Sequence, residues 1–440
     1  MKNNEYLITE NPLKALWRFT LPMILGSLFQ QFYNTADSIV VGRFIGQNAL
    51  AAVGASAALT TVFICIAVGA GVGASVLVSK YFGSRDYSSM KTVASTSMIF
   101  FLLLSIILGA LGIFISRPIM RLLNTPEEIL EISALYLRIY FAGFPFLFMY
   151  NILSNMFNSI GKSYIPLYLL IFSSILNVAL DLWMVASLKM GILGAAIATL
   201  ISQGISAVIS FVLFAHEMKK YKADFFRFNL ARLFDILRLA VPSVVQQSTV
   251  SIGMMLVQSV VNIFGAEALA GYSATMRIEN IFSAIFVSIG NAVSPFVAQN
   301  LGAEKKERIW QGYHAALLLD LIVAIIAAAV IHAFSYRIAN LFLGNNGTTL
   351  AYSVSISYMK WIGTFFIFMG IKMATDGVLR GLGSMNVFMA ANLINLAIRL
   401  AVAMIFAPHL GIGFVWYAVP AGWLANFLIS YAKIRKIKQN

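Results

Sequence analysis

Charged residues and cysteine are scarce in this sequence. Only 11% of the 440 residues are charged and 60% are hydrophobic, which leaves too few charges to cover the surface of a water-soluble domain. The single cysteine, Cys65, excludes a disulfide framework and a thiolate metal site. The sequence also lacks GxxxxGK[ST], HExxH and GxSxG motifs. We therefore expect neither direct use of ATP nor an enzyme of the classes that these motifs mark.

Long apolar runs are abundant, and each is long enough to cross the hydrocarbon core of a bilayer as a helix. Twelve spans are predicted: 17–41, 50–79, 92–116, 132–156, 164–187, 191–215, 239–263, 270–298, 312–335, 352–377, 386–407 and 411–432. The predicted fold class is therefore an all-α polytopic membrane protein with twelve transmembrane helices.

The two halves of the chain resemble each other. LWRFTLP (16–22) matches ILRLAVP (236–242), VSKYFGSRD (78–86) matches VAQNLGAEK (297–305), and LNVALDLWM (176–184) matches INLAIRLAV (394–402). Six spans in each copy predict two pseudo-symmetric six-helix bundles with a site between or within them. The expected domains are an N-terminal lobe (1–215), a cytoplasmic linker with an amphipathic segment (216–238) and a C-terminal lobe (239–440).

The basic residues predict the orientation. Most of the 31 Lys and Arg residues fall in the loops on the side of the two termini, so the positive-inside rule places both termini in the cytoplasm. The net charge of +14 is attributed to this asymmetry and to contact with membrane lipids. Nucleic acid is not an expected partner.

Carboxylates inside the spans are the first candidates for function, because ionisable groups in a membrane are costly. Asp37 lies in the first span, and Asp181 lies in the fifth, one helical turn after Asn177. Such a group could hold a proton or a small hard cation, or it could form structural ion pairs with Arg or Lys. Asn177 is matched by Asn395 in the second copy, whereas Asp181 is matched by Arg399. This asymmetry favours a one-sided ion site.

These motifs resemble transporters of the multidrug and toxic compound extrusion (MATE) family, within the flippase-like superfamily. The resemblance covers essentially the whole chain and rests on Pro22…Asp37…GRFIG, ALAAVGAS, VSKYFGSRD, QNLGAEKKER, RGLGS and LNVALD followed by GILGAAIAT. It implies an N-terminal cation site formed by Asp37, Asn177, Asp181 and Thr199. These residues would be the metal ligands if the ion is Na⁺, and no cofactor other than H⁺ or Na⁺ is expected.

The second lobe departs from the family pattern. Some relatives carry a Glu in the seventh helix, where this chain has Gln246 and Gln247. The candidates in this lobe are Glu279, Arg399 and Asp376. We expect Glu279 to pair with Arg399 or with Lys372. Lys372, Asp376 and Arg380 are spaced by four residues and are expected to form a stripe of charges that reaches toward the headgroups.

The predicted function is a secondary active antiporter of a bacterial-type inner membrane, acting as a monomer. It would export small organic, lipophilic cationic compounds in exchange for H⁺ or Na⁺ by alternating access. The alternative is a lipid or lipid-linked oligosaccharide flippase of the same superfamily, which would need basic residues along its cavity. A channel is a further alternative, but two copies that differ in one acidic site suit alternating access better.

Overall fold

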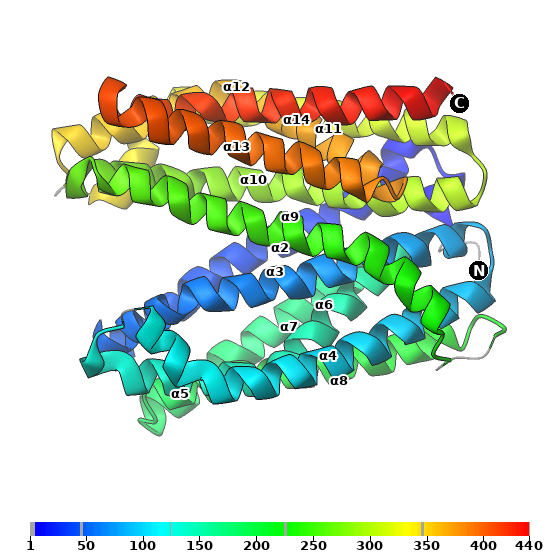
Figure 1. Ribbon diagram of the computed structural model, residues 1–440, viewed down its shortest axis with the longest axis horizontal. Coiled ribbons are helices and arrows are strands. Elements are labelled where there is room, and N and C mark those ends of the chain that lie inside the picture. Colours follow the sequence, from blue (N-terminus) through cyan, green and yellow to red (C-terminus); the bar gives the residue numbers. More distant parts are fainter. Residues whose placement is uncertain (1–4, 45–46, 124, 224–226, 345–346, 440) are drawn as a thin grey trace. The chain divides into compact units, whose positions relative to one another are not determined.

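The computed structural model describes residues 5–44, 47–123, 125–223, 227–344 and 347–439; for 36–44, 47–52 and 57–58 it describes the backbone alone. Within these ranges all regular structure is helical. The helices run in the order α1 (Tyr6–Thr9), α2 (Pro12–Phe44), α3 (Gln47–Gly83), α4 (Tyr87–Leu122), α5 (Glu127–Ala142), α6 (Phe144–Ser159), α7 (Tyr164–Asp181), η2 (Leu182–Ser187), α8 (Ile192–Met218), α9 (Leu230–Asn262), α10 (Gly265–Gly302), α11 (Lys306–Leu343), α12 (Thr349–Gly381), α13 (Met385–Leu410) and α14 (Gly413–Gln439) (Figure 1).

Each predicted span falls on one long helix or on one pair of consecutive helices. The fourth span is the pair α5 and α6, which bend by 48° at Gly143. The fifth is α7 followed by the π-helix η2. Among the described residues, ten helices are long and apolar enough to cross a membrane, and the bent pair would make eleven. The all-α membrane fold is confirmed.

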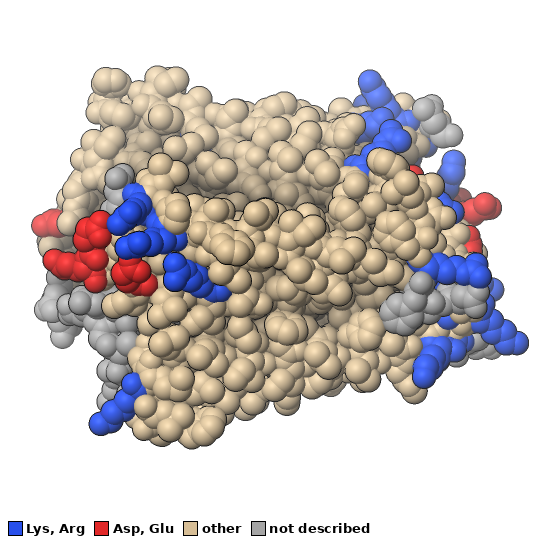
Figure 2. Space-filling view, turned by 60° about the horizontal axis from the view of Figure 1, so that its bottom comes forward, with Lys and Arg blue, Asp and Glu red and all other residues tan. Residues whose placement is uncertain are grey.

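The lateral surface of the long helices is apolar. On α4, for example, Leu103 is 55% exposed, Ile107 56% and Phe114 81%. On the face shown in Figure 2, charged side chains gather toward the two ends of the view, and a broad band without them lies between. Side chains of this kind are stable against hydrocarbon, where only the helix ends reach the headgroups and water.

The internal repeat is also present in the backbone. Positive φ angles occur at matched turns of the two halves: Arg85 (58°) and Glu304 (59°), Gly161 (78°) and Gly383 (73°), and Gly191 (61°) and Gly411 (104°). Arg85 and Glu304 adopt the left-handed conformation although it is unfavourable for a side chain with a Cβ atom. The same helix-ending turn is therefore used in both copies.

The described helices form two compact units. The first unit is Leu25–Val244, and the second unit is Met1–Ile24 together with Val245–Asn440. These bounds differ from the lobes expected at 1–215 and 239–440. Residues 216–238 also differ from the expected linker, because α8 continues to Met218 and α9 already begins at Leu230. Residues 230–238 carry a helical pattern without a breaker, so they form the first turns of a continuous 33-residue helix.

A buried lysine holds the segment that precedes α9 on the first unit. Lys91, on α4, is 2% exposed, and its Nζ donates to the carbonyl oxygens of Tyr221 (2.6 Å) and Ala223 (2.8 Å). Thr96 continues this contact, since it accepts a hydrogen bond from the backbone N–H of Asn229 (3.1 Å). The segment that leads into α9 is thereby held on α4.

The second unit holds the start of the chain in the same manner. Arg308 donates to the carbonyl oxygens of Leu7 (3.2 Å) and Glu10 (2.7 Å), and Lys305 donates to that of Ile8 (3.0 Å). These side chains come from the turn between α10 and α11, at which the repeat places the counterpart of the α3–α4 turn. In each unit, basic side chains near this turn therefore satisfy carbonyl groups of the segment that precedes the first helix of a repeat.

Helices α10 and α12 are the most buried spans of the second unit: 61% and 67% of the residues in their most apolar stretches are buried. Glycine permits their close approach. A Cβ atom on Gly381 would lie 2.6 Å from the carbonyl oxygen of Ser294 and 2.6 Å from Cβ of Val297. Small residues at such contacts are what allows membrane helices to pack closely.

We expect Gly381→Ala to destabilise the protein by about 1–3 kcal/mol, because the added methyl group forces α10 and α12 apart. Gly54→Ala, on α3, is the matched control, since no described atom lies within 4 Å of the position of its Cβ. Thermal unfolding of the purified variants in detergent measures the difference. Equal unfolding temperatures for both variants would contradict the proposed role of Gly381.

Candidate functional site

Three of the predicted cation ligands are described, and two of them meet directly. Asn177 and Asp181 lie one turn apart on α7 and are 1% and 0% exposed. The Asn177 Nδ2 donates to Oγ1 of Thr199 on α8 over 3.3 Å. The side chain of Asp37, the fourth predicted ligand, lies outside the described part of the chain, so its place in the site stays a prediction.

Tyr33 of α2 joins the contact between Asn177 of α7 and Thr199 of α8. Its hydroxyl donates to Oδ1 of Asn177 over 2.8 Å. The sequence analysis missed this residue, although its position one turn before Asp37 could have indicated it. The carboxamide of Asn177 is thus fixed at both ends, by a donor on its oxygen and by an acceptor for its nitrogen.

The backbone changes character directly after Asp181. Helix α7 ends at this residue, and the next six residues form the π-helix η2. A π-helical turn inserts extra backbone into a helix and is rare outside functional sites. The sequence predicted one continuous span over 164–187 and did not indicate this local widening.

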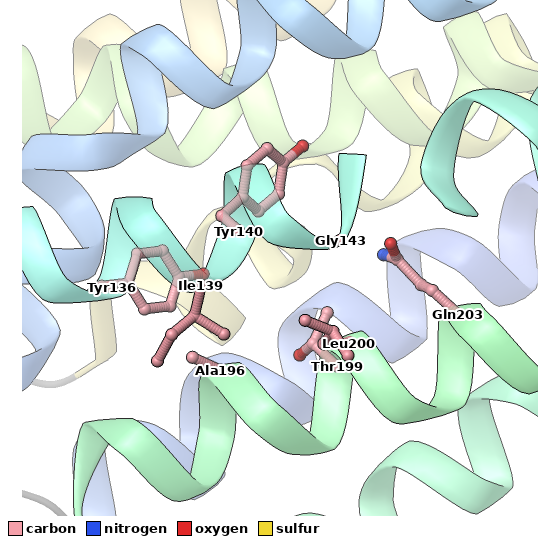
Figure 3. Close-up of a pocket in the computed structure, with 8 residues that line it drawn as sticks. All are labelled: Tyr136, Ile139, Tyr140, Gly143, Ala196, Thr199, Leu200 and Gln203. Carbon is pink, nitrogen blue, oxygen red and sulfur yellow. The ribbon is translucent and has the colours of Figure 1, made fainter. Parts of the chain in front are cut away.

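A small void with a mainly apolar lining adjoins Thr199. It has a volume of about 10 Å³, roughly the space of one water molecule. Figure 3 shows Tyr136 and Tyr140 on α5 and, from α8, Thr199 and Gln203. The Tyr140 hydroxyl is buried and has no hydrogen-bond partner among the described residues.

The second unit contains a larger cavity of about 210 Å³. Its walls come from α9, α10, α12 and α13, with Trp423 of α14. Its polar lining includes Gln246, Gln247, Glu279, Lys372, Asn395 and Arg399. Both glutamines that replace the family's seventh-helix Glu thus line this cavity, as do two of the three second-lobe candidates.

Glu279 has a different partner from the one expected. The hydroxyl of Tyr358 donates to its carboxylate, and Tyr358 is itself stacked between Tyr272 and Trp416. Arg399 is near enough to act electrostatically on Glu279, but no direct ion pair joins the two described side chains. The expected ion pair with Arg399 or Lys372 is not formed between these described side chains: Oε2 of Glu279 accepts from Tyr358, and Lys372 is paired with Asp376.

The expected stripe of Lys372, Asp376 and Arg380 is also absent. Lys372 and Asp376 are buried and form an ion pair with 2.9 Å between Nζ and Oδ2, to which Asn392 adds a hydrogen bond of 3.1 Å. Arg380 instead donates to Oδ1 of Asn291 over 2.8 Å. Burial, which the spacing alone does not reveal, turns the predicted stripe into a closed pair. Asp376 accordingly has a structural partner.

Asp320 of α11 is a buried acid to which sequence reasoning gave no role. It is 0% exposed, and neither carboxyl oxygen has a hydrogen-bond partner among the described residues. It packs against Gly370 of α12, where a Cβ atom would lie 2.7 Å from its own. Its position in the middle of an apolar run was the signal available in the sequence.

Comparisons with known proteins agree with this architecture. The family model MatE matches residues 22–183 and 242–405, one block in each repeat. The chain is 29% identical to the "Probable multidrug resistance protein YpnP" of Bacillus subtilis, covering 91% of this chain and 90% of that protein. It is 23% identical to the "Multidrug export protein MepA" of Staphylococcus aureus strain NCTC 8325, covering 90% and 89%. A solved structure described as MATE in complex with MaL6 superposes with a TM-score of 0.93 at 25% identity, over the full length of both chains.

We expect Tyr33→Phe to loosen Asn177 and to shift the midpoint of any ion-dependent stabilisation by about threefold to tenfold in ion concentration, as the loss of one hydrogen bond implies. The measurement is thermal stability of the purified protein across pH and Na⁺ concentration. Tyr168→Phe is the control, because Tyr168 lies on α7 but is 64% exposed. A midpoint that moves equally in both variants would contradict the role given to Tyr33.

Proposed function

Because the chain belongs to the multidrug and toxic compound extrusion family, we propose that it is a secondary active transporter that exports organic compounds in exchange for H⁺ or Na⁺. The observation that carries this proposal is the group formed by the buried side chains of Asn177 and Asp181 with the half-buried Thr199. It occurs in one copy of the repeat, whereas the position matched to Asp181 holds Arg399. An arginine keeps its proton throughout any cycle, so the matched position could not release or bind an ion in turn.

The donor set supports a small hard ion. The carboxylate of Asp181, Oδ1 of Asn177 and Oγ1 of Thr199 are oxygen ligands of the kind that hard cations take. Na⁺ would be held by these three residues with Asp37, whereas H⁺ would be held by the carboxylates. Either ion supplies the charge that lets a carboxylate remain in a dry environment. Tyr33 fixes the orientation of Asn177, and the π-helical turn η2 gives the helix a point of low resistance to rearrangement.

The substrates proposed are lipophilic organic cations. Drug export in general is supported by the names of two relatives, a probable multidrug resistance protein and a multidrug export protein. The cavity in the second unit supports an organic substrate, because Met254, Met369 and Met373 lie in its wall. Methionine side chains adapt to irregular apolar surfaces. The protein would act as a monomer in a bacterial inner membrane, with both termini in the cytoplasm, as the distribution of Lys and Arg predicts.

The flippase alternative is less well supported. A lipid-linked pyrophosphate would need several free cationic side chains along its path. In the described cavity Lys372 is already neutralised by Asp376, which leaves Arg399 as the one guanidinium in its wall.

Transport of ethidium into everted membrane vesicles tests the proposal. An imposed pH gradient or an imposed Na⁺ gradient should drive uptake, and the gradient that works identifies the coupling ion. We expect Asp181→Asn and Asp37→Asn to slow this uptake at least about tenfold, because a carboxamide can neither bind a proton nor offset the charge of Na⁺.

Asp235→Asn is the matched control, since the Asp235 side chain is 52% exposed at the start of α9. Asp376→Asn is unsuitable as a control, because it would leave Lys372 buried without its counter-charge. Normal uptake by both Asp181→Asn and Asp37→Asn, or uptake that follows ATP after both gradients are collapsed, would refute the proposal.

A further inference from the structure

Arg399 occupies an unusual position in the cavity of the second unit. Its Nε atom is buried, and the guanidinium makes no hydrogen bond or ion pair with any described residue. The group is always protonated and presents its donors in a planar fork. A buried donor of this kind is costly unless a partner satisfies it. The natural partner is an acceptor that enters the cavity.

The other charged groups of this cavity already have partners. Glu279 accepts a hydrogen bond from Tyr358, and Lys372 is paired with Asp376 at 2.9 Å. Arg399 is thus the one charged side chain of the described lining that lacks a hydrogen-bond partner. A ligand that enters the cavity would meet a guanidinium whose hydrogen-bond donors are unused, with Glu279 near enough to act on it electrostatically.

Asn395 provides a second, independent sign of a ligand. It lies one turn before Arg399 on α13, lines the same cavity and is 8% exposed. Its Oδ1 is buried without a hydrogen-bond partner among the described residues. A carboxamide can turn its nitrogen in place of its oxygen toward an acceptor, so it can add a donor beside the guanidinium.

Helix α14 holds both side chains in place through Gly422. A Cβ atom at this position would overlap with Oδ1 of Asn395 and would lie 3.2 Å from Cγ of Arg399. The two side chains therefore rest on a surface that only glycine leaves free. This packing limits their movement before a ligand binds, which reduces the entropy lost on binding.

The rest of the lining suits an apolar body. Met254, Met369, Met373, Leu396 and Trp423 also line the cavity. Binding sites for small organic molecules commonly combine such a lining with a few polar groups that fix the orientation.

We propose that this cavity binds organic molecules that carry a carboxylate beside an apolar body, and that Arg399 recognises the carboxylate. The guanidinium can form two parallel hydrogen bonds to the two carboxylate oxygens, and Asn395 supplies a further donor. The inference rests on the proposed export function and extends the proposed substrates from lipophilic cations to organic compounds that carry a carboxylate. It assigns recognition of the ligand's carboxylate to the second copy of the repeat, in which Arg399 stands at the position matched to Asp181.

A pair of dyes that differ in one group tests this assignment. Rhodamine 110 carries a free carboxylate, and rhodamine 123 is its methyl ester. Equilibrium binding of each to the full-length protein in nanodiscs is measured by fluorescence polarisation, without an ion gradient. We expect the wild type to bind rhodamine 110 more tightly than rhodamine 123. Arg399→Met should reduce this preference by about tenfold or more, as the loss of charged hydrogen bonds implies.

Arg277→Met is the matched control, because Arg277 is an exposed arginine of α10 outside the cavity lining; it should keep the preference. Arg399→Lys keeps the charge but loses the planar fork, so it should retain part of the preference. If Arg399→Met does not fold, the dye preference of Arg399→Lys tests the inference instead.

An unchanged preference in the folded Arg399 variants, or no preference in the wild type, would overturn the inference. Because the assay contains no gradient, its outcome does not depend on the transport result. Loss of coupled ethidium uptake with an intact dye preference would refute the antiport proposal alone.

Discussion

The cost of placing a charge in hydrocarbon governs this structure. With so few charged residues, the chain places most at the helix ends and provides partners for those inside. Lys372 is paired with Asp376, Glu217 lies between Lys162 at 2.7 Å and Lys220 at 2.6 Å, and Glu279 is bonded to Tyr358. Against this background a polar group without a described partner stands out. Among the described residues, Arg399 and Asp320 are charged side chains of this kind.

The same constraint separates what could be predicted from what could not. Span positions follow from hydropathy, because a membrane leaves the backbone few alternatives to a helix. The repeat matched the segments that contain Arg85 and Glu304, and the structure has the same turn in both. The link between Asn177 and Thr199 was expected from the family resemblance, and the structure brings the two together.

The hydrogen-bond partner of a buried charged side chain was not predictable. Tyr358 and Glu279 are 79 residues apart, and no local sequence pattern couples them. The π-helix after Asp181 also has no sequence signal, since its composition is that of an ordinary apolar helix.

Duplication gave the two halves a common backbone, and their side chains then diverged. Both copies keep the asparagine, as Asn177 and Asn395, in the same place on the equivalent helix. In the first copy it is held by Tyr33 and Thr199 near an acid. In the second it lies beside Arg399 in the wall of a cavity. One scaffold thus offers an acidic site and a basic site at related positions, which is a simple route to binding an ion and an organic molecule with the same fold.

The docking of residues 5–10 on the turn between α10 and α11 has a consequence for biosynthesis. Nδ2 of Asn300 donates to the carbonyl oxygen of Leu7, which lies 293 residues earlier in the chain. Asn300 therefore emerges from the ribosome long after Leu7. At typical rates of synthesis this interval is roughly 15–60 s. The corresponding contact of the first unit, from Lys91 to Tyr221, spans 130 residues and can form much earlier. Residues 5–10 therefore wait for their partners until the turn between α10 and α11 has been made, whereas the contact of Lys91 with Tyr221 needs a much shorter interval.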